Sequence, residues 1–158
     1  MKRRDLLKGA ALGALAIAGG REIVFAKEYF PAKVDASLFK GINKPEHPEN
    51  KSQLAKLHVP IIKAPETVKT GQIFAVDVTI GEILHPMGPA HWIEHVQVNI
   101  GNEPAGLLMF QSQGYMKPEG RFNLMLSDSI KGKEISLVVQ NKCNRHGIWQ
   151  SHFNVKVT

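Results

Sequence analysis

From about residue 57 onward, apolar and polar residues alternate in short runs that are typical of β-strands. The runs are rich in β-branched side chains, and alternation with a period of two turns one face of a strand inward and the other outward. Turn residues bound them, as at Thr70-Gly71 and Lys131-Gly132. No stretch after residue 57 keeps a helical period over three turns. The expected strands are 58–62, 73–80, 95–100, 106–110, 122–126, 135–140 and 153–157.

This spacing of short strands predicts an all-β fold. Several strands within about 100 residues, separated by turns, indicate a seven-stranded antiparallel immunoglobulin-like β-sandwich. The sequence contains no internal repeat and no sign of a second domain. A domain of this size can bury a working core without cross-links. We therefore expect residues 57–158 to form one β-sandwich domain.

The segment before the sandwich is expected to be irregular. Residues 27–56 are mostly polar, and Pro31, Pro45 and Pro48 interrupt any regular element. We interpret residues 27–56 as an extended N-terminal arm.

The first 26 residues have the organisation of an export signal. A basic start with the pair Arg3-Arg4 precedes an apolar stretch from Gly9 to Gly20. That stretch is shorter than the roughly 20 residues a spanning helix needs, and a cleavage site is expected after Ala26. The paired arginines favour the twin-arginine route, and hence a periplasmic protein. No other segment is long and apolar enough to span a membrane, so none is expected once residues 1–26 are removed.

Much of the positive charge belongs to that signal. The whole chain has 20 Lys and Arg against 14 Asp and Glu, and residues 27–158 have 15 against 12. The remaining charge of +3, without basic clusters, argues against nucleic acid as a partner. It is compatible with attraction of a small anion.

Histidines and one cysteine are the residues most suited to chemistry. His85 and His91 belong to a loop in which prolines and a glycine forbid a helix. His58 is expected to open a strand, and Cys143-x-x-His146 follows another. A single histidine in such a place is more often a surface residue. Together, at strand ends and with no second cysteine for a disulfide, these five residues indicate a metal site.

The identity of the metal is narrowed by the type of ligand. Structural zinc takes four ligands, usually with more than one sulfur. Blue copper pairs its cysteine and two histidines with a weak axial methionine, and no methionine follows Met125. Four imidazoles and one thiolate around iron would leave a sixth position open, which is typical of a reactive site.

At this point the sequence resembles a known family. His-Pro-x4-His (85–91) and Cys-Asn-x-His-Gly (143–147), preceded by His-Val-Pro (58–60), are similar to the superoxide reductases, that is, neelaredoxin and the catalytic domain of desulfoferrodoxin. The resemblance covers residues 56–158. It implies one iron per chain and a one-electron reduction of superoxide to hydrogen peroxide. The iron ligands that it implies are His58, His85, His91 and His146 in the equatorial positions and Cys143 in the axial one.

The chain departs from that family just before its first ligand. Members usually carry Glu-Lys there, whereas this chain has Lys56-Leu57. The resemblance therefore implies no glutamate for the sixth position, where water or hydroxide would take its place. It leaves Lys56 as the candidate catalytic cation that attracts superoxide. The alternative is a solvent-exposed lysine at a strand edge.

Other functions of the same fold remain open from the sequence. The main alternative is a non-catalytic metal-binding or electron-transfer module. The expected partners of the enzyme are superoxide and an unidentified small electron-donor protein, and self-association as a homo-oligomer is left open. The remaining histidines lie outside the motif, and the two tryptophans that follow ligand positions are candidates for shielding the site. These residues are His47, His95, His152, Trp92 and Trp149.

Overall fold

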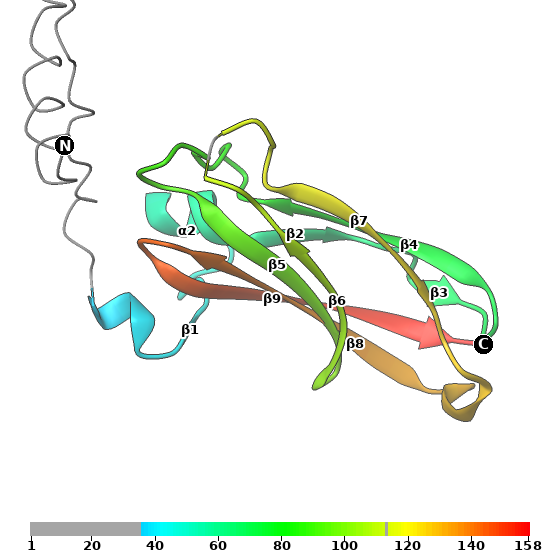
Figure 1. Cartoon of the computed structure of the whole chain (residues 1–158). Coiled ribbons are helices and arrows are strands. Elements are labelled where there is room, and N and C mark those ends of the chain that lie inside the picture. The colour runs from blue at the N-terminus through cyan, green and yellow to red at the C-terminus, as the bar shows by residue number, and fades with distance from the viewer. Residues whose placement is uncertain (1–35, 113) are drawn as a thin grey trace, which may run out of the picture.

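Two β-sheets packed face to face form most of the chain that the computed structural model describes, residues 36–112 and 114–158 (Figure 1). The expected export signal lies outside these residues. In the larger sheet the order is β1 (Ile42–Asn43), β9 (Gly147–Val157), β8 (Glu134–Cys143), β5 (Ile93–Ile100) and β6 (Glu103–Met109), and β3 (Thr67–Val68) also pairs with β9. The smaller sheet has the order β2 (Pro60–Lys63), β4 (Ile73–Ile80) and β7 (Glu119–Met125).

The predicted all-β sandwich is confirmed. Each of the seven expected strands corresponds to one of the longer strands, and these pair antiparallel. The two-residue strands β1 and β3 were not expected, and both pair parallel to β9. Short 3₁₀ turns lie at Ala36–Phe39 (η1) and Asp128–Ile130 (η2). No helix in the described ranges is long and apolar enough to cross a membrane.

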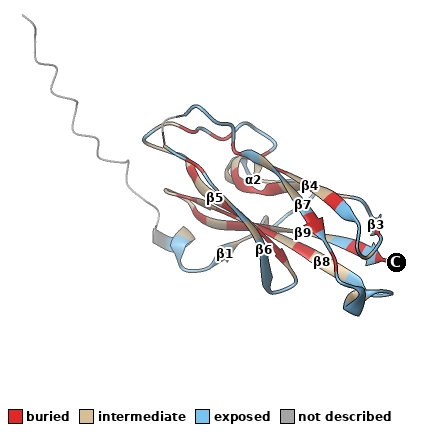
Figure 2. Cartoon of the chain, turned by 45° about the vertical axis from the view of Figure 1, so that its right-hand side comes forward, coloured by how far each residue is buried: buried red, intermediate tan, exposed pale blue. Residues whose placement is uncertain are grey.

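The core lies between the sheets and follows the predicted alternation. Along β4, Phe74, Val76, Val78 and Ile80 are buried while the residues between them are more exposed (Figure 2). Strand β8 buries every second residue from Leu137 in the same way. Burial of one face of each sheet supplies the hydrophobic free energy of the fold, at roughly 25 cal/mol for each Å² of apolar surface removed from water.

One local expectation is wrong. His58 does not open a strand but is the last residue of helix α2 (Gln53–His58), and strand β2 begins at Pro60. The helix begins inside the segment expected to be irregular, where the Ser52 side chain accepts a hydrogen bond from the Ala55 backbone N–H. With six residues, α2 is too short to produce a recognisable helical period.

The fold gathers several loops at one end of the sandwich, opposite the C-terminus (Figure 1). Helix α2, the β4–β5 connection and the β8–β9 hairpin meet there. The hairpin turn ends at Gly147, whose φ of 70° is rarely adopted by other residues. A Cβ at Gly147 would press directly against the Leu38 carbonyl, so the chain before β1 packs on this turn.

We expect Gly147→Ala to destabilise the protein more than Gly132→Ala does. Both glycines have a positive φ, but a Cβ at Gly132 would meet no atom within 4 Å. Gly132→Ala therefore isolates the backbone strain, about 1 kcal/mol. Gly147→Ala adds steric overlap worth roughly 1–3 kcal/mol. Urea unfolding of the metal-free variants measures both effects, and equal losses of stability would contradict this packing.

Candidate metal centre

Five side chains from three separate segments converge at this end of the sandwich. His58 ends α2, His85 and His91 belong to the connection between β4 and β5, Cys143 ends β8, and His146 lies in the turn before β9. His58, His85 and Cys143 are almost completely buried, whereas His91 and His146 are half-buried. The structure thus brings together all five candidate metal ligands that the sequence indicated.

The four imidazoles form a square. His146 Nδ1 lies 3.0 Å from His58 Nε2 and 3.0 Å from His91 Nε2, and His85 Nε2 lies 3.1 Å from His58 Nε2. Ring centroids along the four sides are 4.4–4.7 Å apart, and those of the diagonal pair His58 and His91 are 5.8 Å apart. Rings along each side are nearly perpendicular, so the nitrogens, rather than the ring faces, point at one another.

The cysteine sulfur completes the donor set. Cys143 Sγ lies 3.1 Å from His91 Nε2 and 3.6 Å from His146 Nδ1. The ligand atoms of His58, His85, His91 and Cys143 all lie within 4.8 Å of one another. One sulfur therefore adjoins the square of nitrogens.

These distances fit a metal with ligands at right angles. Two nitrogens, each about 2.1 Å from a common ion and 90° apart, would be separated by about 3.0 Å. A tetrahedral ion would separate them by about 3.4 Å and would have no diagonal pair. Five donors arranged as a square and one further atom thus fit a square-pyramidal site with one position open, and do not fit a closed structural zinc site.

Hydrogen bonds fix which nitrogen of the two buried rings is free to bind a metal. His58 Nδ1 lies 2.7 Å from the Leu54 carbonyl, and His85 Nδ1 lies 2.6 Å from the Pro86 carbonyl. Because a carbonyl only accepts, each Nδ1 donates its proton, and each Nε2 keeps its lone pair for a metal. Carbonyl partners of this kind commonly orient metal-binding histidines.

Burial keeps the imidazoles neutral, as metal ligands must be. Desolvation is the main reason that the pKa is lowered from 6.5 to about 4 for His58, about 3 for His85 and about 4 for His91. Burial likewise raises the pKa of the Cys143 thiol, and the backbone N–H of Arg145, 3.5 Å from Sγ, opposes that change. A thiolate in such a pocket needs a compensating cation, which a bound metal ion provides.

Asn144 holds the two ligand-bearing loops together. Its side-chain oxygen accepts a hydrogen bond from the Trp92 backbone N–H at 2.9 Å, and its Nδ2 donates to the Ala90 carbonyl at 3.2 Å. The Asn144 backbone N–H also donates to the Trp92 carbonyl at 3.2 Å. The Cys143–His146 turn and the end of the β4–β5 connection, residues 90–92, are therefore held together.

A second set of contacts supports the His146 side of the square. Trp149 Nε1 donates to the His146 carbonyl at 2.9 Å, and the Trp149 ring stacks on His58 with centroids 5.3 Å apart. Asn43 Nδ2 donates to the carbonyls of Leu38 and Ile148 and lies 3.4 Å from that of His146. Sequence analysis missed Asn43, because its role depends on pairing between β1 and β9, about a hundred residues apart.

Comparison with known proteins identifies the family of this chain. The family model described as "Desulfoferrodoxin" matches residues 49–152, about two thirds of the chain. The chain belongs to the desulfoferrodoxin family. Its relatives include a Thermotoga maritima protein named "Putative superoxide reductase", which is 28% identical over 123 residues; the match covers 63% of this chain and 86% of that protein.

Solved structures of the same kind share the fold. A superoxide reductase (neelaredoxin) from Ignicoccus hospitalis is 30% identical, with a TM-score of 0.62, and the match covers 80% of this chain and all of that one. A superoxide reductase from Nanoarchaeum equitans, 20% identical, has a TM-score of 0.55 over 73% of this chain and all of that one, which supports the fold alone.

Lys56, the candidate catalytic residue of this desulfoferrodoxin-family chain, lies on α2 two residues before the ligand candidate His58. Its side chain is half-buried, and its backbone carbonyl accepts hydrogen bonds from the N–H groups of Glu82 and Ile83. The helix thereby fixes the Lys56 backbone against the β4–β5 connection. Its catalytic role stays a prediction.

The remaining histidines do not join the square. His47 is exposed and pairs with Glu49 in the segment before α2. His152 Nε2 accepts a hydrogen bond from Gln150 Nε2 at 2.7 Å on β9, and His95 lies on β5, paired with Met109 of β6. They offer matched controls for substitutions in the metal centre.

The lowered histidine pKa values predict that the metal-free protein loses stability in acid. Below pH 6.5 the histidines of the unfolded chain bind protons, whereas the buried imidazoles of the folded protein stay neutral down to about pH 4. The free energy of unfolding therefore falls as the pH is lowered across that interval. At pH 5 the loss is on the order of 2 kcal/mol for each of the buried rings of His58 and His85. Urea unfolding in chelator between pH 7 and pH 5 measures it; a flat profile would contradict neutral buried imidazoles.

Proposed function

We propose that this protein is a superoxide reductase that converts superoxide to hydrogen peroxide at one mononuclear non-haem iron. The observation that carries this proposal is the square of four imidazole nitrogens with one adjoining thiolate sulfur. In this site the iron would be held by His58, His85, His91, His146 and Cys143. Membership of the desulfoferrodoxin family supports the same conclusion.

The ligands suit a centre that gives away one electron. Ferrous iron, when bound, supplies one electron to superoxide and becomes ferric, and two protons complete hydrogen peroxide. Neutral imidazoles leave the positive charge of the ion largely uncompensated, which favours an incoming anion. Cys143 would hold the iron through its thiolate, which would donate electron density to the ion, as thiolate ligands do in haem proteins.

Access to the centre is asymmetric. His58, His85 and Cys143 are buried against the core, while His91 and His146 are half-exposed. A small anion can therefore approach from the side of the last two rings, and the sulfur stays protected from water. We propose that the position left open by the five donors receives superoxide.

Lys56 is the residue that we propose as a catalytic cation beside this position. It precedes His58 by two residues on α2, and a positive charge there would raise the local concentration of superoxide. With Leu57 as its neighbour, this chain has no glutamate at these two positions to occupy the open position, so we propose water or hydroxide there in the resting state.

The setting of the reaction follows from the first 26 residues. A twin arginine before an apolar stretch supports export by the twin-arginine route, in which a protein folds and takes up its metal before crossing. We propose a periplasmic location and a small protein as the electron donor.

Reaction stoichiometry tests the proposed activity directly. The protein is loaded anaerobically with ferrous iron and mixed with superoxide, and peroxide formed and iron oxidised are counted for each superoxide consumed. We expect one peroxide and one ferric ion, because each electron comes from the iron. Half a peroxide without net oxidation of iron would instead indicate a dismutase, and no reaction would favour a non-catalytic metal-binding or electron-transfer module.

Substitution of one corner of the square should separate ligands from ordinary histidines. His91→Ala removes a donor whose Nε2 lies 3.0 Å from His146 Nδ1, whereas His95→Ala removes a histidine outside the square. We expect iron content well below one ion per chain for His91→Ala and unchanged content for His95→Ala. Metal analysis after dialysis measures both; equal iron contents in the two variants would contradict the assignment.

A further inference from the structure

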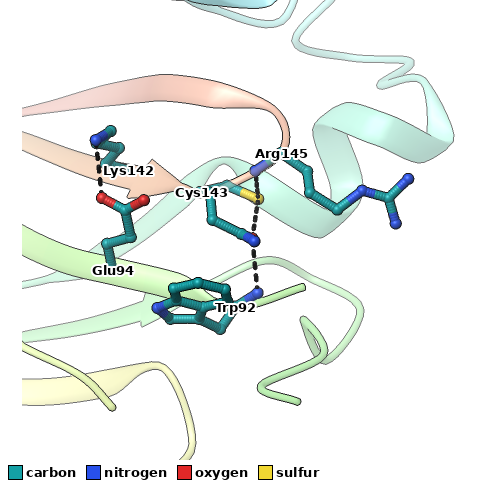
Figure 3. Close-up of polar contacts among 6 residues, drawn as sticks. Trp92, Glu94, Lys142, Cys143 and Arg145 are labelled. Carbon is teal, nitrogen blue, oxygen red and sulfur yellow. Dashed lines mark hydrogen bonds and ion pairs between the residues drawn. The ribbon is translucent and has the colours of Figure 1, made fainter. Parts of the chain in front are cut away.

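A cationic residue, Arg145, follows the metal-centre cysteine by two positions. Arg145 occupies the turn between Cys143 and His146, and its backbone N–H reaches Cys143 Sγ at 3.5 Å. The side chain of Arg145 leads away from the sulfur, on the side of the turn opposite Trp92 (Figure 3). The guanidinium is thus fixed to the same short turn as two of the five donors.

The charge of Arg145 is not neutralised within the described part of the chain. The guanidinium makes no ion pair there, and its Nε is buried without a hydrogen-bond partner. Burying an unpaired donor of a charged group costs free energy, about 1–3 kcal/mol. The structure therefore retains a cation here at some cost to stability.

The neighbouring acid does not pair with Arg145. Glu94, which lies close to Cys143, is paired with Lys142 at 2.8 Å (Figure 3). Glu94 still acts on Cys143, where its charge raises the pKa of the thiol and opposes the effect of Arg145. Arg145 is therefore a cation beside the metal centre that this acid opposes but does not bind.

The field of Arg145 is felt at two of the proposed ligands. Burial is the main cause of the low pKa of His91, His146 lowers it further, and Arg145 comes next. At Cys143 burial raises the pKa, and the Arg145 charge, after two backbone N–H groups, works in the opposite direction by favouring the thiolate. Lys56 is not among the causes of either shift.

We propose that Arg145 supplies to the metal centre a positive charge that no ion pair holds in the described part of the chain, and that this charge favours the reduced iron and the arrival of an anion. This inference rests on the proposed function, because it concerns the same iron. Ferric iron carries one more positive charge than ferrous iron, so a nearby cation disfavours the oxidised state. The same Coulomb attraction strengthens binding of a small anion, and salt screens it.

The test replaces the charge and measures properties other than turnover. Arg145→Gln and Arg145→Met remove the charge in two different shapes, Arg145→Lys keeps it, and Lys131→Gln removes an exposed cation next to η2 at the far end of the sandwich. The measurements on iron-loaded protein are the reduction potential of the iron and the affinity of the ferric form for azide at several ionic strengths. Iron content is determined for every sample.

We expect both uncharged variants to have a lower reduction potential and roughly three- to tenfold weaker azide binding at low salt, with a smaller dependence on salt. Arg145→Lys and Lys131→Gln should remain close to the wild type. The proposal is overturned if the uncharged variants match Lys131→Gln, if Arg145→Lys changes as much as they do, or if wild-type ferric protein binds no azide.

These measurements do not depend on the reductase reaction. If iron-loaded wild-type protein fails to consume superoxide while the potential still follows the charge at residue 145, the proposed function fails and the electrostatic role of Arg145 stands. If superoxide is reduced but the reduction potential of the iron does not change when the charge at residue 145 is removed, only the inference about Arg145 fails.

Discussion

The structure depends on holding four imidazole nitrogens and one sulfur about 3 Å apart at the end of a β-sandwich. Without a metal ion, lone pairs that point at one another repel, and each buried polar atom has lost its contacts with water. No single element of secondary structure can arrange five donors in this way. The arrangement is possible because α2, the β4–β5 connection and the β8–β9 hairpin meet there. Backbone hydrogen bonds tie the connection to the helix and to the hairpin, and the Trp149 ring stacks on His58 between the hairpin and the helix.

The contacts around the donors serve this constraint more than they serve the core. Asn144 joins the two ligand loops, Trp149 supports both the His58 ring and the His146 carbonyl, and Asn43 brings the segment before α2 onto the same turn. Each of these contacts restricts the orientations that a ligand side chain or its loop can adopt. A site prepared in this way loses little conformational entropy when a metal binds, so more of the binding free energy remains for affinity.

Much of this could be predicted from the sequence, and the reasons are physical. Alternation with a period of two predicts every longer strand, because one face of each strand is buried. Helix α2 could not be predicted, since six residues do not establish a helical period, and so His58 was assigned to a strand. The five donors were predictable because histidines and a lone cysteine at strand ends have few other uses.

The order of the donors around the square could not be predicted. His146 adjoins His58 across 88 residues and His91 across 55. The pairing of β8 with β5 brings His146 to His91, and the packing of α2 on Trp149 of β9 brings it to His58. Asn43 is hidden from the sequence for the same reason. Long-range register, rather than local pattern, determines which polar atoms meet.

A square of donors with one sulfur also limits what the protein can do. A closed tetrahedral site would stabilise the fold but leave no position for a substrate. Here the buried sulfur and the half-exposed pair His91 and His146 give the centre a protected side and an accessible side. Because the imidazoles are neutral, the ion's charge is offset only by the thiolate, and an anion is the ligand that such a centre attracts most strongly. The chemistry thus follows from burial: the same desolvation that keeps the imidazoles unprotonated makes the open position selective for a small anion.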